Sequence, residues 1–528
     1  MRTHDYIVVG AGAAGCIVAG RLAEDPAVSV LLIEAGQRRH SPLLSIPAAE
    51  TILMGNPKYD WRFQTEADPT IEGRQVTIPR GRLFGGSNAI NGMLFVRGQR
   101  QDYDQWQSLG NPGWSWADVL PYFRRLERAP ELGGDRGQDG PISVGPPRDR
   151  DKLCDAFLAA AVKSGYQENA DYNSGDQEGF GYYQVNHEHG RRSSAAGGYL
   201  RATRPNLTVL TNAHVTGLRF DGTRCRGVSF RRGGTSHEAD CGREVLLSAG
   251  TVQSPQILEL SGIGSADVLR KAGVPVVRDL PGVGENFRDH YAARLRWRVR
   301  DMVTFNERSH GLALGREIVR YLLSRRGLLS LPIALGYGFV RSTDREPSPD
   351  LQFHFSPASY GASSSRRLDS APGMTLGVYP LRPGSRGSIH IGSADPLAAP
   401  LIRPRFLDDE RDGALLVAGM RIARQIMGDP SLDAYRAFEL IPGPDVRTDD
   451  ELLDYVRGHG DTSYHPVGTC RMGPDPMAVV DHRLRVHGIS GLRVIDASVM
   501  PTMVSGNTNA ASLMIGEKGA AMVIEDHR

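Results

Sequence analysis

The sequence predicts two interlocked domains: an α/β domain with a Rossmann-like sheet, and an α+β domain with an antiparallel sheet. Three observations predict this fold class. The chain has 528 residues, and one hydrophobic core rarely grows past roughly 250 to 300 residues. Residues 6–34 follow the order strand, tight turn, helix, strand. Between about 300 and 460, apolar residues alternate as they do in half-buried strands.

The composition is that of a globular protein with a small-molecule partner. Hydrophobic residues make up 40% of the chain and charged residues 23%, so a large core is expected. The 62 Lys and Arg residues nearly balance the 60 Asp and Glu residues. The resulting net charge of +2 does not indicate a basic surface for nucleic acid, so we expect no nucleic-acid partner.

The cysteines and the start of the chain give further expectations. The five cysteines are scattered without a C-x-x-C pair, which argues against a metal site and a disulfide framework, so we expect reduced core thiols. Residues 1–5 run directly into a predicted strand, and no segment has the roughly 18 unbroken apolar residues of a membrane span. We expect a cytoplasmic protein without a transmembrane segment. The oligomeric state stays open, a homo-oligomer included.

The first element is a glycine turn between a strand and a helix. Residues 6–9 are an apolar run that ends at G-A-G-A-A-G, and a helical pattern follows. Gly10, Gly12 and Gly15 stand where a tight turn, a close backbone approach to pyrophosphate and helix–strand packing require glycine. The free N–H groups at the start of the helix would face the anion.

An acidic residue completes this pattern. Residues 28–34 form a second apolar strand, which ends at Glu34, 19 residues after Gly15. A carboxylate at that place can accept hydrogen bonds from ribose hydroxyls. The alternative is a glycine-rich turn that only packs. Strand, helix, second strand and acid together predict dinucleotide binding, but they do not choose between FAD and NAD.

The remaining elements of the first domain lie far along the chain. Residues 244–250 are predicted as a buried strand, with a helix opening near 254–255. Residues 492–496 are predicted as another strand, and 509–524 have the spacing of a helix. We expect the first domain to comprise 1–150, 192–299 and 463–528.

The second domain has a different pattern. Residues 351–355 and 388–391 alternate like half-buried antiparallel strands, and 412–425 are typical of an amphipathic helix. We expect this domain to comprise 151–191 and 300–462.

Five ordered motifs resemble those of one family. Residues 80–98 (RGRLFGGSNAINGMLFVRG) match the first signature of the glucose-methanol-choline (GMC) oxidoreductases, and residues 250–264 resemble the second. The set is completed by 281–290, 464–473 and 506–510. The resemblance covers nearly the whole chain. It implies an FAD domain assembled from discontinuous segments, and a second domain whose antiparallel sheet covers the flavin.

The resemblance also implies which residues hold FAD. Some relatives attach FAD covalently through a histidine in the first signature. The matching residue here is Ile90, which has no nucleophile, so we expect non-covalent FAD. The implied contacts are Gly10, Gly12, Gly15 and Glu34 for the ADP half; Gly86, Asn88 and Asn91 for the pyrophosphate and flavin; and Asp496, Ala497 and Asn509 for the ribityl chain and ring.

His465 is the candidate base. Taking hydride from a carbinol carbon requires the hydroxyl proton to leave, and a neutral imidazole with a pKa near 6.5 suits that task. His465 precedes Pro466, which favours an extended backbone and limits where the ring can point. It also lies in the motif at 464–473. For His290 we favour a structural hydrogen-bonding role.

Its partner is one of two asparagines. In the family the second catalytic residue, His or Asn, lies shortly before an apolar helix segment, which here selects Asn507. Asn509 would then face the flavin. The alternative makes both residues helix N-caps, a role that asparagine favours. Both interpretations are compatible, because a helix starting there aims its positive end at the flavin.

The family resemblance implies oxidation of a primary alcohol to an aldehyde with FAD. Reoxidation by a quinone-like acceptor and reoxidation by O₂ both stay open. A hydroxynitrile-lyase-like enzyme with an idle flavin is a second class, and a flavin-bearing binding module is a third. Residues 327–337 occupy the segment that in the family lies near the substrate cavity. They carry no carboxylate to pair with a quaternary amine, which argues for uncharged alcohols over choline.

Overall fold

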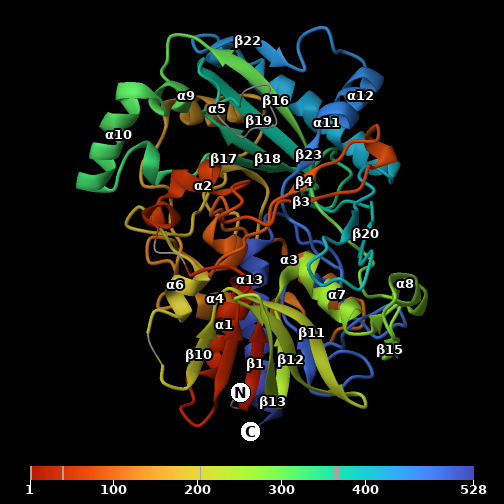
Figure 1. The fold of residues 1–528 in the computed structure, drawn as a ribbon. Coiled ribbons are helices and arrows are strands. Elements are labelled where there is room, and N and C mark those ends of the chain that lie inside the picture. The colour runs from red at the N-terminus through yellow and green to blue at the C-terminus, as the bar shows by residue number, and fades with distance from the viewer. Residues whose placement is uncertain (1–2, 39–40, 203, 361–367, 528) are drawn as a thin grey trace.

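The computed structural model describes residues 3–38, 41–202, 204–360 and 368–527. Two seven-stranded sheets organise the molecule, one in its lower half and one in its upper half as drawn in Figure 1. The chain passes between them several times, so each half is assembled from segments far apart in sequence. This arrangement confirms the predicted fold class of an α/β unit combined with an α+β unit.

The first sheet has a parallel centre. β1 (His4–Val9) lies between β2 (Val30–Ile33) and β13 (Thr235–Leu247) and runs parallel to both. β10 (Leu207–Leu210) and β24 (Leu492–Val494) add further parallel pairings. Where they pair at the centre of the sheet, these strands are apolar and buried: residues 7–9 of β1, 245–247 of β13 and all four residues of β2. The predicted strands at 6–9, 28–34, 244–250 and 492–496 all belong to this sheet.

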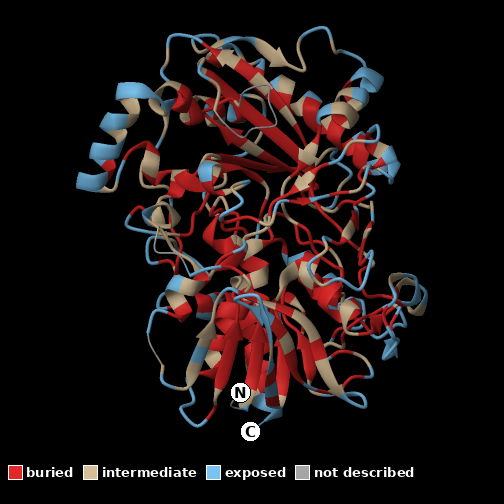
Figure 2. Ribbon diagram, in the orientation of Figure 1, coloured by how far each residue is buried: buried red, intermediate tan, exposed pale blue. Residues whose placement is uncertain are grey.

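Two helices pack together against the central strands. α1 (Ala13–Leu22) follows β1, and α13 (Asn509–Asp526) lies beside it although the two are some 500 residues apart in sequence. Figure 2 shows that their contact lies in the buried core. The C-terminal helix therefore brings its own first turn to the glycine turn of β1 and α1. That is how residues near 507 meet residues near 12.

The helix predicted to open near 254–255 begins earlier. α7 spans Gly250–Leu260 and contains Pro255. A proline inside a helix removes the N–H that would bond the carbonyl four residues before it. Here that carbonyl, Thr251 O, instead accepts from Thr469 Oγ1 at 2.6 Å. The replacement bond explains why the helix tolerates Pro255.

The second sheet is antiparallel. Across it lie β22 (Arg436–Ile441), β16 (Tyr291–Val299), β19 (Gly373–Pro380), β18 (Leu351–Ser356), β17 (Gly336–Val340) and β7 (Gly179–Tyr182), and β23 (Asp461–Thr462) pairs with β16. The expected first-domain segment 192–299 included β16. The structure moves this strand into the second sheet, because its alternating buried and partly exposed residues pair with β19.

Two further predictions concern the second half. α11 (Glu410–Met427) covers β19, which confirms the amphipathic helix predicted at 412–425. The strand predicted at 388–391 also exists as β20 (Ser388–His390), but it pairs with β21 (Leu401–Arg403) outside the large sheet. All five cysteines are buried, which confirms that they belong to the core.

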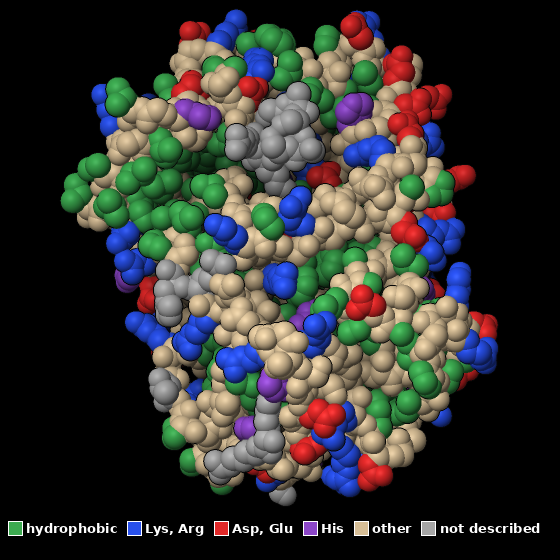
Figure 3. All heavy atoms as spheres, viewed as in Figure 1, with side chains coloured by type: hydrophobic (Ala, Val, Ile, Leu, Met, Phe, Trp, Pro, Cys, Tyr) green, Lys and Arg blue, Asp and Glu red, His purple; other side chains and the backbone are tan. Residues whose placement is uncertain are grey.

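α10 (Gly311–Ser324) stands out from the body of the molecule. Leu312 is 88% exposed and Leu323 84%, and Ile318, Val319 and Leu322 are exposed as well. Figure 3 shows hydrophobic side chains gathered over this helix. Only Tyr321 of α10 is buried, so the helix adds little to the core. Among the described residues, no helix is long and apolar enough to cross a bilayer.

Candidate active site

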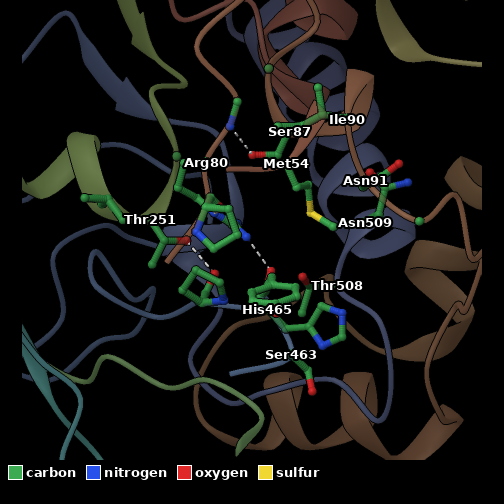
Figure 4. Close-up of a pocket in the computed structure, with 18 of the residues that line it drawn as sticks. Met54, Arg80, Ser87, Ile90, Asn91, Thr251, Ser463, His465, Thr508 and Asn509 are labelled. Carbon is green, nitrogen blue, oxygen red and sulfur yellow. Dashed lines mark hydrogen bonds between the residues drawn. The ribbon is translucent and has the colours of Figure 1, made fainter. Parts of the chain in front are cut away.

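A cavity of about 920 Å³ lies between the two sheets. Except for Gly15, it is lined by every residue that the sequence analysis assigned to the cofactor or to the chemistry. Figure 4 shows Ile90 and Asn91 on one side of it, with His465 and Ser463 on another. The site is therefore built from the glycine turn, the first signature, the segment around 465 and the start of α13.

The glycine turn has the geometry of an anion cradle. Gly10 has a φ of +96°, and a side chain on Gly15 would lie 1.9 Å from Gly10 O, so Gly15 lets the helix pack closely. A side chain on Gly12 would meet nothing within 4 Å, so the space above it is open to a ligand. α1 has no side-chain cap, and its first N–H groups are available for the pyrophosphate.

Glu34 closes the nucleotide end of the cavity. Its Oε2 accepts from Ala11 N at 2.9 Å and its Oε1 accepts from Gly36 N at 2.7 Å. Burial raises the pKa of Glu34 to about 7, although these two backbone bonds pull it down. A carboxylate has about four acceptor positions, so two remain for ribose hydroxyls. The glycine turn and Glu34 together fit the ADP half of FAD.

The first-signature asparagines are held by protein contacts. Asn88 Nδ2 donates to Asn509 Oδ1 at 2.9 Å, and Asn88 Oδ1 accepts from Ala195 N at 2.7 Å. Asn91 Oδ1 accepts from Arg192 Nη1 at 2.6 Å. Asn509 Nδ2 is buried and has no partner among the described residues. A buried donor facing the cavity fits a polar group of a bound cofactor.

Asp496 is saturated by donors from the protein. Its Oδ2 accepts from Gly250 N and Ser254 Oγ, and its Oδ1 accepts from the backbone and hydroxyl of Ser498. These bonds tie the end of β24 to the start of α7. The side chain of Asp496 therefore shapes the cavity wall.

His465 and Asn507 meet in the cavity. Asn507 Nδ2 lies 3.0 Å from His465 Nε2. On the other side of the ring, His465 Nδ1 lies 3.0 Å from His290 Nδ1, and the backbone N–H of His465 donates to Asp289 Oδ1 at 2.8 Å. The segment around 465 is thus fixed at the backbone and at both ring nitrogens.

A carbonyl sets the tautomer of both histidines. Leu381 O lies 2.9 Å from His290 Nε2, and a carbonyl only accepts, so Nε2 of His290 carries the proton. Desolvation lowers the pKa of His290 to about 4, so the ring is neutral and its Nδ1 is an acceptor. His465 must then donate through Nδ1. Its Nε2 keeps a lone pair, which faces Asn507.

A second chain of hydrogen bonds orients Asn507. Tyr379 donates to Gln352 Oε1 at 2.6 Å, so the Gln352 amide turns its Nε2 outwards. This nitrogen donates to Tyr183 at 2.7 Å and to Asn507 Oδ1 at 3.2 Å. The Asn507 amide must then present its Nδ2 to His465. Both chains agree that His465 Nε2 is an acceptor.

None of these second-sheet residues was predicted from the sequence. His354 also belongs to the set, since its Nδ1 lies 2.9 Å from Tyr183 and its Nε2 lies 2.8 Å from Tyr379. The alternation in 351–355 was a usable signal, because it places Gln352 and His354 on one face of a strand. Asn507 and Asn509 do not cap a helix: α13 has Thr508 at its N-cap position with no side-chain cap bond. Their amides bond His465, Gln352 and Asn88 instead.

Electrostatics keep His465 unprotonated. Desolvation lowers its pKa well below the ordinary value, and the neighbouring His290, His354 and Arg80 lower it further. Next to it, burial raises the pKa of Asp289 to about 7. The site therefore holds a neutral imidazole whose Nε2 lone pair accepts from the Asn507 amide.

The substrate side of the cavity is mixed in character. Of residues 327–337, only Ile333 and Ala334 line it. The face of the second sheet contributes Arg294, Arg296 and Tyr379. The lining thus combines apolar side chains with two arginines and a tyrosine.

Comparison with known proteins places this architecture in a family. Family models described as GMC oxidoreductase match residues 4–292 and 383–516. The chain is 39% identical to an alcohol dehydrogenase [acceptor] of Pseudomonas putida, over 99% of this chain and 96% of that protein. It is 40% identical to the mitochondrial choline dehydrogenase of Homo sapiens, over 98% and 89%. Pyridoxine 4-oxidase from Mesorbium loti has a TM-score of 0.90 and 32% identity, with both chains covered completely. The chain belongs to the GMC oxidoreductase family of FAD enzymes.

Proposed function

We propose that this protein oxidises a primary alcohol to an aldehyde, with His465 as the base. The observation that carries the proposal is the pair of hydrogen-bond chains that leave a lone pair on His465 Nε2 next to Asn507 Nδ2. An alcohol that displaces the Asn507 amide from this lone pair can donate its hydroxyl proton to His465 Nε2 and accept a hydrogen bond from Asn507 Nδ2. Both bonds locate one oxygen atom.

The protein supplies positioning and a proton acceptor. As the carbinol C–H bond breaks, positive charge would build on the oxygen unless the hydroxyl proton leaves to a base. His465 takes that proton, and its Nδ1–H remains bonded to His290. Bound FAD would supply the acceptor for the hydride that leaves the carbinol carbon.

Product analysis separates this proposal from a lyase. The holoenzyme is given benzyl alcohol or hexanol with an artificial electron acceptor, and aldehyde is the expected product. Cyanohydrin cleavage without alcohol oxidation would support the lyase instead. We further propose a quinone-like acceptor rather than O₂; the P. putida relative is named a dehydrogenase with an unspecified acceptor, which is compatible with this choice. Comparing the two acceptors at one alcohol concentration tests this choice.

The FAD should be released completely by acid. Ile90 lines the cavity at the place where some relatives carry the attaching histidine, and its side chain cannot form a covalent bond to the flavin. Acid precipitation of the purified yellow protein should therefore leave a colourless pellet and a yellow supernatant. Yellow colour that stays with the pellet would contradict the inference from Ile90.

The rate of alcohol-driven flavin reduction should stay constant as the pH falls through about 6.5, the usual pKa of histidine. The neutral form of His465 is the base, and a lowered pKa keeps this form populated to lower pH. The rate constant is measured anaerobically across neutral and mildly acidic buffers. A decline with an apparent pKa near that of free histidine would show that the base is not desolvated.

Uncharged alcohols should be better substrates than choline. Arg294 and Arg296 line the cavity, and a quaternary ammonium would be repelled by them and poorly solvated beside Ile333 and Ala334. Dimethylbutanol, the uncharged isostere of choline, should have a kcat/KM at least about tenfold higher. Steady-state kinetics with both alcohols measure the ratio, and a preference for choline would refute this.

A further inference from the structure

We propose that the natural substrate carries a carboxylate, held by Arg294 and Arg296 at the end of the cavity away from His465. This inference rests on the proposed alcohol oxidation and names the substrate class of the same site. Three observations support the inference: the two guanidinium groups lie on the second sheet, they are incompletely paired with carboxylates, and they lie at a distance from His465 and Asn507.

The sheet places both arginines on the wall of the cavity. Successive residues of a strand point to opposite faces, so Ala292, Arg294 and Arg296 of β16 share one face, and all three line the cavity. Arg294 pairs with Gly377 of β19, and Arg296 pairs with Thr375. The small side chains on β19 leave room for the two arginine side chains to extend over the sheet.

Charge on this strand is unbalanced at Arg296. Arg294 Nη1 lies 3.7 Å from Asp461, and Arg298 Nη1 lies 2.7 Å from Asp369. Arg296 forms no salt bridge with any described carboxylate; its Nη1 donates to Tyr360 O at 3.0 Å.

The Arg296 guanidinium is also incompletely hydrogen-bonded. Its Nε is buried and has no hydrogen-bond partner among the described residues. Burial lowers the pKa of Arg296, and the neighbouring Arg294 lowers it too, although Tyr455, Tyr360 and Asp369 oppose them. Two neighbouring positive charges, one of them with an unused donor, are stabilised by an anion. Because the guanidinium is a planar fork, a carboxylate is the matching partner.

The sheet also gives a distance. Gln352 and Tyr379, which orient the catalytic pair, are directly opposite each other on β18 and β19. Gly377 lies two residues from Tyr379 along β19 and pairs with Arg294. Thr375 lies four residues from Tyr379 and pairs with Arg296. At a rise of about 3.3 Å per residue, the two arginines lie roughly 7 and 13 Å along the strand from the catalytic row. A medium-chain ω-hydroxy acid spans this interval.

The test compares ω-hydroxyoctanoate with octanol on the holoenzyme. We expect kcat/KM for the hydroxy acid to be about ten- to hundredfold higher, as a charge-assisted bond would give. Arg296→Gln should bring the ratio close to one. Arg298→Gln is the matched control, because this arginine of the same strand is paired with Asp369 and does not line the cavity. It should keep the ratio of the parent.

Binding without turnover separates the two proposals. Calorimetry with octanoate and octanamide measures affinity whether or not alcohols are oxidised. The parent should bind octanoate about tenfold more tightly than octanamide, and Arg296→Gln should bind the two ligands equally well. Equal affinity for the two ligands would overturn the carboxylate site. The site would also be overturned if Arg296→Gln lost affinity for octanoate and octanamide equally, or if Arg298→Gln lost as much affinity for octanoate as Arg296→Gln does. Tight octanoate binding without alcohol oxidation would instead overturn the proposed function and keep the anion site.

Discussion

His465→Ala should reduce flavin with alcohol about 10²- to 10⁴-fold more slowly than the parent, because this factor is the usual contribution of a general base. The change removes the lone pair that accepts the hydroxyl proton, but none of the groups that line the ADP end of the cavity. The variant should therefore keep its FAD and its fold. Anaerobic stopped-flow absorbance of the oxidised flavin, at saturating alcohol, measures the rate.

Asn507→Ala is the comparison for this variant. It removes one oriented hydrogen bond to the alcohol oxygen and leaves the base, so its loss should be smaller. The order of the two losses is the informative result. If flavin reduction in His465→Ala stayed within about tenfold of the parent rate, the hydroxyl proton would go to another group. The candidates are His290 and His459, of which His459 lines the cavity.

His290→Leu should lower kcat/KM by roughly ten- to hundredfold, although His290 does not face the alcohol. Leucine removes the acceptor for His465 Nδ1–H, so the proton can move to Nε2, and the lone pair then faces leucine rather than the substrate. The pH profile should change as well, because the tautomer is no longer fixed. Rates of flavin reduction measured across pH on FAD-loaded protein report both effects.

His290→Gln is the control for this change. A glutamine carbonyl can accept from His465 Nδ1, and its amide can donate to Leu381 O, so much of the activity should return. His290 is fully buried, so FAD content and circular dichroism are measured on both variants. Equal rates in parent and leucine variant, with FAD retained, would show that His290 does not position the base.

The local parts of the fold could be predicted from the sequence. The glycine turn, Glu34 and the strands around them lie within 34 residues, and their signals are the short-range spacing of apolar residues and glycines. α11 was equally clear because its apolar face repeats within a single helix. Such elements need no knowledge of which segments meet in space.

The contacts around the catalytic pair depend on strand pairing across the second sheet. Gln352 reaches Asn507 only because β18 lies beside β19, where Tyr379 fixes its amide. Nothing near 352 in the sequence specifies this register. β16 was assigned to the wrong half for the same reason: its alternation predicts a half-buried strand, but not which sheet it joins.

The two asparagines show how tertiary contacts override a local preference. Asparagine before a helix predicts an N-cap, but both amides are engaged by groups that are distant in sequence. Of the segment 327–337, which the family resemblance places near the substrate cavity, only Ile333 and Ala334 line it. The arginines of β16 come from a strand whose position could not be inferred.

The central claim is that the site removes hydrogen from an alcohol carbon into bound FAD, and anaerobic mixing tests it most directly. The holoenzyme is mixed with octanol and with octanol deuterated at the carbinol carbon, in the absence of any acceptor. We predict loss of the oxidised flavin absorbance with one aldehyde formed per flavin, and a slower rate for the deuterated alcohol. Flavin that stays oxidised with these alcohols and with ω-hydroxyoctanoate would contradict the account.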